Sequence, residues 1–280
     1  IRNLIITAQD PFETGLVGYF LKKKFNVSLQ IQIHTDFLSP YFRRESFLNK
    51  MRVLLAKRLI KKADCVRAVS ERIRSSLYGI AEVKVSVLPI FVDIEKIRNS
   101  SVRTDLHKKY PGRFIILMAS RLTKEKNIGL AIEAICDMLN PKPLLLIVGE
   151  GPEEKNLKQK TKNCKLTTDV VFEPWTDDLI SCYKTADLFL LTSNYEGYGR
   201  TAVEAAAAGL PVMMTDAGVA LGQVVPVGDQ SALAMSLRKV ISDPEERKAL
   251  IEKQNEFFQH WPTKEEYLIK LKEAWQKCFL

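Results

Sequence analysis

Hydrophobic residues in this chain come in short continuous runs that alternate with amphipathic stretches, and this alternation predicts the order of strands and helices. Runs that are apolar throughout are typical of strands buried on both faces of a parallel sheet. In the later part of the chain the predicted strands are 114–120, 143–149, 169–172, 187–193 and 211–215. The helices predicted between them are 128–139, 152–160, 177–186 and 200–208. This order is typical of a doubly wound α/β domain, whose ligands bind at the carboxyl ends of its strands.

The earlier part of the chain repeats the same alternation over fewer elements. Its predicted strands are 3–8, 28–34, 66–70 and 83–89, and its predicted helices are 15–25, 45–62 and 71–77. This amounts to about half of a usual nucleotide-binding domain. In the helix 45–62 an apolar stripe is expected to face the core; it consists of Leu48, Met51, Leu55 and Leu59. A last helix is expected near residues 264–278.

Composition places the chain among ordinary globular proteins. It has 280 residues, of which 46% are hydrophobic and 27% charged, enough for one or two domains. No apolar run approaches the roughly 18 residues of a membrane-spanning helix, and no signal peptide is evident. The start at Ile1 suggests that preceding residues have been removed or are not shown.

Cysteine usage predicts reduced thiols and a cytoplasmic location. The five cysteines are widely spaced, and none forms a Cys-x-x-Cys pair; they are residues 65, 136, 164, 182 and 278. Neither a disulfide framework nor a zinc site is therefore expected, and no metal-binding residues are assigned. The formal net charge of +9 is concentrated in residues 22–24, 43–44 and 50–62. Such asymmetry predicts an anionic partner: acidic lipid, nucleotide or nucleic acid.

The stretch 194–204, Asn-Tyr-Glu-Gly-Tyr-Gly-Arg-Thr-Ala-Val-Glu, carries the clearest chemistry. Its glycines let a ligand approach the main chain, and the helix predicted to start at Arg200 offers unpaired N–H groups that favour phosphate. Glu196 and Glu204 flank this start with seven residues between them. Because carboxylates repel phosphate, they are better suited to accept hydrogen bonds from sugar hydroxyls. The stretch therefore predicts donors for a diphosphate beside acceptors for sugars.

This pattern resembles the Glu-x7-Glu signature of retaining nucleotide-sugar glycosyltransferases of family 4, the group 1 transferases with a GT-B fold. The resemblance implies an α/β protein of two doubly wound, parallel-sheet (Rossmann-like) domains that face a cleft, the first one incomplete here. The implied domains are an acceptor-side domain over 1–95, with the helix 264–280 packing back on it, and a donor-binding domain over 96–263. Relatives have a longer connection where this chain has only residues 218–224.

The resemblance also implies roles for individual residues. Glu196 would contact the transferred sugar, His34 would lie near that sugar, and Arg121 and Lys126 would stabilise the leaving diphosphate in place of a metal ion. The residues expected to bind the nucleotide-sugar are Gly149, Gly151, Trp175, Gly197, Tyr198, Gly199, Arg200, Thr201 and Glu204. Glu173 and Pro174 stand where the family usually has Phe-x-Gly, which puts the contact with the base in question.

The implied activity is metal-independent transfer of a hexose, with retention of configuration, from a nucleotide-diphosphate donor to a sugar or lipid-linked acceptor. A UDP-sugar is the expected donor substrate, and no other cofactor is expected. Residues 45–62 predict weak contact with an anionic membrane on its inner face, whereas nucleic acid is not an expected partner. Three alternatives remain: a sugar-nucleotide epimerase of the same plan, a nucleic-acid-binding protein, and a non-catalytic donor-binding subunit.

Overall fold

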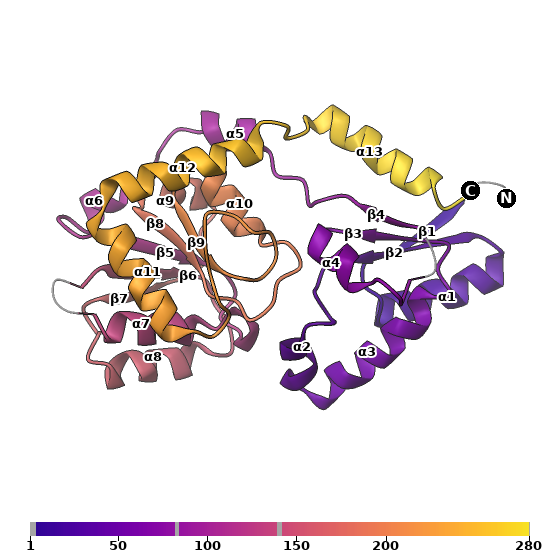
Figure 1. Ribbon diagram of the computed structural model, residues 1–280, viewed down its shortest axis with the longest axis horizontal. Coiled ribbons are helices and arrows are strands. Elements are labelled where there is room, and N and C mark those ends of the chain that lie inside the picture. The colour runs from indigo at the N-terminus through magenta and orange to yellow at the C-terminus, as the bar shows by residue number, and fades with distance from the viewer. Residues whose placement is uncertain (1–3, 82–83, 139–141, 280) are drawn as a thin grey trace. The chain divides into compact units, whose positions relative to one another are not determined.

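The computed structural model describes residues 4–81, 84–138 and 142–279, which form two compact units (Figure 1). The ends of three predicted elements, at Asn3, Val83 and Leu139, lie outside the described residues. The first unit comprises Ile1–Phe91, Tyr195–Tyr198 and Pro262–Leu280, and the second comprises Val92–Asn194 and Gly199–Trp261. Although the sequence-based division assigned all of 96–263 to one domain, Tyr195–Tyr198 group with the first unit.

The first unit contains a four-stranded parallel sheet of order β1-β2-β3-β4. Its strands are β1 (Ile5–Ala8), β2 (Ser28–Ile33), β3 (Cys65–Ala68) and β4 (Val85–Val87). Its helices are α1 (Glu13–Phe25), α2 (Pro40–Glu45), α3 (Phe47–Ile60), α4 (Glu71–Ser76) and α13 (Lys264–Gln276). The central strand β2 is buried on both faces, and its apolar residues Leu29, Ile31 and Ile33 form the core of this unit.

Helix α3 differs from its sequence prediction in where it starts and in the face that it buries. Ser46 ends α2 and caps α3 by accepting a hydrogen bond from the Asn49 amide, so the predicted helix 45–62 begins at Phe47. The buried face runs through Val53, Ala56 and Leu59. The expectation that the Leu48–Met51 part of the apolar stripe faces the core is wrong, because both side chains are about half exposed.

Helix α13 is tied to the sheet of the first unit at its C-terminal end. Thr263 and Glu266 form a capping box at its start, and the buried Gln30 side chain donates to the Ala274 carbonyl at 3.1 Å. A disulfide joins Cys65 of β3 to Cys278, with the Cα atoms 5.0 Å apart. The expectation of reduced thiols is therefore wrong for this pair, and the inference of a cytoplasmic location loses that support.

The second unit is a six-stranded parallel sheet of order β10-β9-β8-β5-β6-β7 (Figure 1). Its strands are β5 (Ile115–Ala119), β6 (Leu144–Val148), β7 (Val170–Glu173), β8 (Leu188–Leu191), β9 (Val212–Thr215) and β10 (Gln223–Val225). Its helices are α5 (Ile94–Asn99), α6 (Leu106–Lys109), α7 (Ile128–Cys136), α8 (Glu154–Asn163), α9 (Leu179–Thr185), α10 (Arg200–Ala207), α11 (Gln230–Ser242) and α12 (Pro244–Phe258), with a 3₁₀ turn at Lys124–Lys126. The doubly wound α/β fold predicted from the alternation is confirmed.

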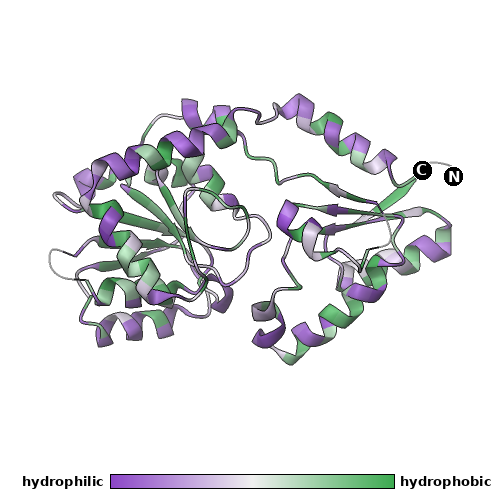
Figure 2. Cartoon of the chain, viewed as in Figure 1, coloured by the Kyte–Doolittle hydropathy of each residue, from purple (hydrophilic) through white to green (hydrophobic). Residues whose placement is uncertain are grey.

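Apolar strands and helix faces build the core of the second unit, which Figure 2 shows as green strands beneath helices with purple outer faces. The short connection between β9 and β10 closes without a longer loop. Gly222 has φ +68°, and a Cβ there would lie 2.1 Å from the Val212 carbonyl oxygen, so only glycine fits this turn. Among the described helices, none combines the length and apolarity that crossing a bilayer requires.

Candidate functional site

The strand order of the second unit reverses between β5 and β8, which places a topological switch point between their carboxyl ends. The loops that leave these two strands are bonded to each other. The Thr192 hydroxyl donates to the carbonyl oxygens of Lys126 and Asn127 at 3.1 and 3.0 Å, and the Asn194 amide donates to the Glu125 carbonyl at 2.8 Å. The turn that carries Lys126 is therefore held beside the segment that leads into α10.

Helix α10 begins at this switch point. Gly199 precedes it with φ +86°, a left-handed conformation that glycine adopts without strain. In the described chain no side chain caps this N-terminus. The Ala202 amide donates to the Gly199 carbonyl at 3.0 Å, so the positive dipole end and the amides of Arg200 and Thr201 are the groups that suit an anion. Predicted donor-binding residues Arg200 and Thr201 are the first two residues of the helix.

The predicted cations lie on the turn after β5. Arg121 is largely exposed and its guanidinium lies 3.3 Å from the carboxylate of Glu125, four residues later, while Lys126 ends the 3₁₀ turn. Their turn is bonded to the loop after β8, so the structure brings the predicted Arg-x4-Lys residues to the same sheet edge as the start of α10. A sheet edge of this kind, with a helix N-terminus beside two basic residues on a bonded turn, suits a diphosphate.

Glu204 lines a cavity of about 310 Å³ together with Trp175 and Arg200. One carboxylate oxygen accepts from Arg200 at 2.7 Å and the other from the Tyr183 hydroxyl at 3.2 Å. Tyr183 is almost fully buried, and burial, followed by the charge of Glu204, raises its pKa well above the ordinary value. Trp175 is 53% exposed, so its ring is open to a ligand in this cavity.

Gly149 and Gly151 have a packing explanation. A Cβ at Gly149 would lie 2.0 Å from the Ser120 carbonyl oxygen, and one at Gly151 would lie 2.4 Å from that of Leu122. The loop after β6 is therefore pressed against the loop after β5, where Leu122 donates to the Glu150 carbonyl at 2.9 Å. These glycines keep the Arg121 turn in place, and their contact with a ligand stays a prediction.

The segment Tyr195–Tyr198 is anchored within the first unit. The ring of Tyr195 packs edge-on against Phe42 with centroids 5.5 Å apart, and its hydroxyl bonds to the Glu45 carboxylate. Tyr198 is 4% exposed, which leaves its backbone rather than its ring for ligand contact. A Cβ at Gly197 would lie 1.8 Å from the His34 carbonyl oxygen. The backbone of Gly197 therefore lies close to that of His34, and Glu196 is the residue immediately before this contact.

His34 follows β2 and is half-buried. Its Nε2 lies 3.1 Å from Gln32 Oε1, and burial, together with the charge of Arg67, lowers the pKa of the imidazole. Sequence reasoning missed Gln32, Arg67 and Tyr183 as partners of site residues. For Gln32 a signal existed, since an amide inside a strand buried on both faces needs a polar partner; Tyr183 carried no comparable signal.

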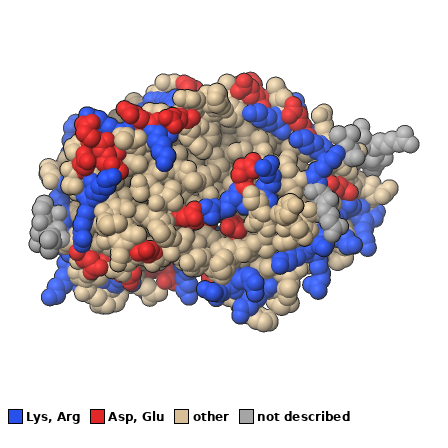
Figure 3. Space-filling model, viewed as in Figure 1, with Lys and Arg blue, Asp and Glu red and all other residues tan. Residues whose placement is uncertain are grey.

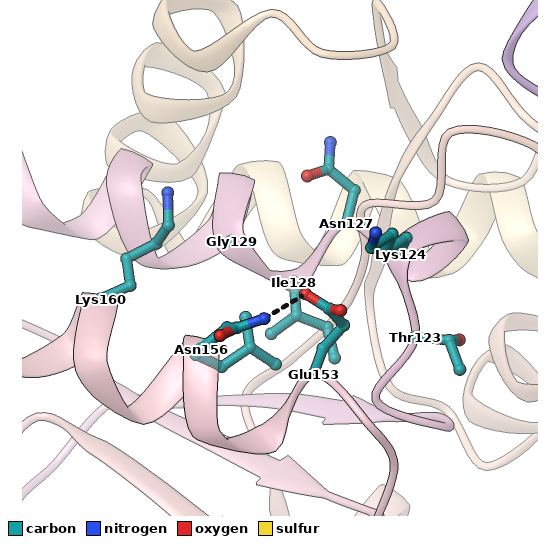
Figure 4. A pocket seen from close by; sticks show the side chains of 9 residues that line it. Thr123, Lys124, Asn127, Ile128, Gly129, Glu153, Asn156 and Lys160 are labelled. Atoms are coloured by element: carbon teal, nitrogen blue, oxygen red, sulfur yellow. Dashed lines mark hydrogen bonds between the residues drawn. The ribbon is translucent and has the colours of Figure 1, made fainter. Parts of the chain in front are cut away.

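A second cavity, of about 230 Å³, lies at the starts of α7 and α8 (Figure 4). It holds none of the predicted site residues. Asn156 donates to Glu153 at 3.2 Å within it, and Lys160 pairs with Glu133 beside it. Across the described stretches no group of three or more His, Cys, Asp and Glu side chains could hold a metal ion.

The architecture and the site at the switch point define a GT-B type α/β protein. Residues 103–257 match the family described as glycosyl transferases group 1, more than half of the chain, and the protein belongs to this family. It is 26% identical over 224 residues to alpha-monoglucosyldiacylglycerol synthase from Streptococcus pneumoniae, covering 75% of this chain and 51% of the relative. It is 26% identical over 215 residues to UDP-Gal:alpha-D-GlcNAc-diphosphoundecaprenol alpha-1,3-galactosyltransferase from Escherichia coli, covering 73% and 56%.

Solved structures share the fold at low identity. Sucrose-phosphate synthase from Thermosynechococcus elongatus superposes with a TM-score of 0.85 at 22% identity, covering 98% of this chain and 73% of that one. Anabaena Alr3699/HepE in complex with UDP gives a TM-score of 0.82 at 21% identity, covering 96% and 78%. The chain spans about half the length of the curated relatives described above.

Proposed function

We propose that this protein transfers a hexose from a UDP-sugar to an acceptor with retention of configuration and without a metal ion. The observation that carries the proposal is the bonding of the Lys126 turn to the loop that leads into α10, at the switch point of the sheet. A leaving nucleoside diphosphate gains negative charge as the glycosidic bond breaks, and cations fixed beside uncapped amides stabilise that charge most in the transition state.

The predicted residues at the switch point and beside His34 take roles in this reaction. Arg121, Lys126 and the first amides of α10 hold the diphosphate, and Glu204 accepts hydrogen bonds from the ribose in the cavity that Trp175 also lines. Glu196 orients the transferred sugar next to His34. The acceptor attacks from the face that the diphosphate leaves, and a departing phosphate oxygen takes the acceptor proton; no protein nucleophile is assigned.

The choice of donor and acceptor class rests on what the relatives are named for. The Escherichia coli relative is named for UDP-Gal and a diphosphoundecaprenol-linked acceptor, and the Streptococcus pneumoniae relative for a glucosyldiacylglycerol. A GT-B neighbour has been solved with UDP-glucose. We infer a UDP-sugar donor and a lipid-linked or polysaccharide-precursor acceptor.

We also propose weak contact with an anionic membrane through α3. Phe47, Met51 and Leu54 lie along its outer side and are 76%, 50% and 51% exposed. Figure 2 shows green and purple alternating along this helix, and in Figure 3 the charged side chains over the edge that α2 and α3 form are mainly blue. Basic residues around an exposed apolar stripe suit an anionic lipid surface, where each cation contributes about 1 kcal/mol.

Substitution of Lys126 tests the proposed role of the turn, and Lys124 supplies the matched control. Both lysines belong to the same 3₁₀ turn, but Lys124 lines the second cavity. Lys126→Ala should lower the single-turnover rate of sugar transfer about 100-fold, the usual effect of removing one fixed group that stabilises transition-state charge. Lys124→Ala should retain the wild-type rate.

Product analysis completes the test. Sugar linked to the acceptor with the donor's anomeric configuration, formed in the presence of EDTA, is the expected result. Epimerised donor with no acceptor product would identify the epimerase instead. Equal rates for Lys126→Ala and Lys124→Ala would remove Lys126 from the mechanism.

A further inference from the structure

A run of buried polar side chains lies behind His34 in the first unit. Gln32 precedes His34 by two residues and shares its side of β2, and Arg67 stands directly opposite Gln32 on β3. Gln32 is 5% exposed and Arg67 6% exposed. Polar groups this deeply buried in a parallel sheet are costly unless every one is bonded, so their arrangement has a definite orientation.

The bonds around Gln32 determine which of its side-chain atoms faces Arg67. Arg67 Nη1 lies 3.0 Å from Gln32 Oε1, and a guanidinium has only donors. The Gln32 atom at this position must therefore be the carbonyl oxygen. His34 Nε2 lies 3.1 Å from the same oxygen. Because two acceptors would repel at that distance, Nε2 of His34 must carry a hydrogen.

We propose that Gln32 and Arg67 are positioning residues that hold His34 as the neutral imidazole with its hydrogen on Nε2, so that the Nδ1 lone pair faces the reactants. The inference rests on the proposed function for the place of His34 beside the transferred sugar. Nδ1 then accepts a hydrogen bond from a hydroxyl of the sugar or of the acceptor. It cannot donate a proton to the leaving group.

The other bonds of Arg67 explain why His34 stays neutral. Its Nε donates to the Leu88 carbonyl at 3.2 Å, and its Nη2 donates to the Pro89 carbonyl at 3.1 Å and to the Tyr267 hydroxyl at 2.7 Å. Within the described chain these acceptors are all uncharged, so no carboxylate offsets the guanidinium beside the imidazole. Burial and this positive charge both disfavour the doubly protonated imidazole, and both lower the pKa of His34.

Other charged groups near His34 come from three segments. Asp36 follows in the same loop, and burial raises the pKa of its carboxyl, while the charge of Arg72 on α4 opposes that rise. Glu196 is carried by the segment whose backbone abuts His34. Beyond Arg67, Tyr267 of α13 donates to the Pro89 carbonyl at 2.9 Å, so the C-terminal helix holds the far end of the network.

Nitrogen-15 NMR of the histidine rings tests this assignment directly in the full chain. The sequence has only three histidines, residues 34, 107 and 260, so His34 can be assigned with one His34→Asn variant. The expected result at neutral pH is an imidazole protonated at Nε2 and unprotonated at Nδ1. A neutral ring protonated at Nδ1, or a doubly protonated ring, would overturn the proposal.

Gln32→Glu supplies the second measurement. A carboxylate in place of the amide accepts from the ring and stabilises imidazolium, so the pKa of His34 should rise by about one unit, with the signals of His107 and His260 unchanged. An unchanged His34 titration would contradict the proposal. If this variant does not fold, Gln32→Met removes the acceptor, and the preference for Nε2–H should be lost; persistence of that preference would equally refute it.

The proposed sugar transfer and the proposed state of the His34 ring can be refuted independently of each other. The ring measurements need no substrate, so absence of sugar transfer would reject the proposed function without deciding the tautomer. If transfer is observed, Gln32→Glu should move the acid limb of the kcat profile upward by the same amount as the NMR titration, with the KM for the donor within twofold of wild type. A loss of kcat that is equal at all pH values would indicate a merely structural role.

Discussion

Replacement of Gly197 by alanine measures how closely the Glu196 segment must approach His34. The added Cβ would lie 1.8 Å from the His34 carbonyl oxygen and 2.5 Å from its carbonyl carbon, whereas ordinary van der Waals contact begins at 3.4 Å. The two backbones would have to separate by about 1.6 Å, the difference between 1.8 and 3.4 Å. Because φ at Gly197 lies outside the left-handed region, alanine adds crowding and no backbone strain.

The expected effect is on the chemical step. A misplacement of about 1 Å at a reacting centre can lower a rate about 100-fold, which corresponds to about 2.7 kcal/mol in the activation free energy. Single-turnover kinetics should therefore show a fall in kcat of about this size for Gly197→Ala. Affinity for UDP, measured by calorimetry, should change little, because Lys126, Arg200 and Glu204 are untouched.

Gly209→Ala is the matched control at the other end of α10. Gly209 has φ +85°, and no atom of the described residues lies within 4 Å of the position that an added Cβ would take, so alanine there adds strain without crowding. That variant should lose about 1 kcal/mol or more of unfolding free energy and keep the wild-type kcat. If Gly197→Ala keeps kcat within about threefold of wild type, the reasoning that joins backbone approach to catalysis is refuted.

Two further changes test neighbouring features. Tyr183→Phe removes the hydroxyl that donates to Glu204, and because a hydrogen bond to a charged group is worth about 1.5 kcal/mol, UDP affinity should fall about tenfold. Calorimetry with 2′-deoxy-UDP should show a smaller loss of affinity. Equal losses for both nucleotides would argue against a contact between Glu204 and the ribose. Phe47→Ser with Met51→Ser removes exposed apolar area from α3, so flotation with anionic vesicles should decrease at unchanged Tm. Neutral vesicles are the control, and identical flotation of variant and wild type would end the membrane proposal.

Local sequence pattern was sufficient for the core strands of both sheets, because parallel strands buried on both faces leave a clear apolar signature; strand β10 and helices α11 and α12 were not predicted. The strands at 114–120 and 143–149 appear as β5 and β6, and family membership is confirmed. The orientation of α3 could not be read in the same way. Its sequence carries apolar residues on two faces, and only tertiary packing decides that Val53 and Ala56 face inward while Met51 does not.

Contacts between residues far apart in sequence account for the other differences. Cys65 and Cys278 are separated by 213 residues, so the scattered spacing of the cysteines gave no indication of their bond. The residues of the candidate site likewise fall into those that sequence motifs indicate and those that only the structure reveals. Motif spacing predicted roles for Glu196 and Glu204, whereas the contacts of Tyr183 with Glu204 and of Arg67 with Gln32 form only in the folded chain.

Buried polar residues in the strands and helices are the partners of motif residues that the structure reveals and the sequence motif does not. Gln32 and Tyr183 each occupy a position that packing alone would fill with an apolar side chain, and each bonds a residue that the motif had already singled out. Burial of a polar group costs free energy unless the group forms a hydrogen bond, so a buried polar side chain indicates that its hydrogen bond matters to the protein. Each side chain contacts a proposed ligand-binding residue from its buried side, so we expect its removal to change the ligand contacts of His34 or Glu204 before it unfolds the protein.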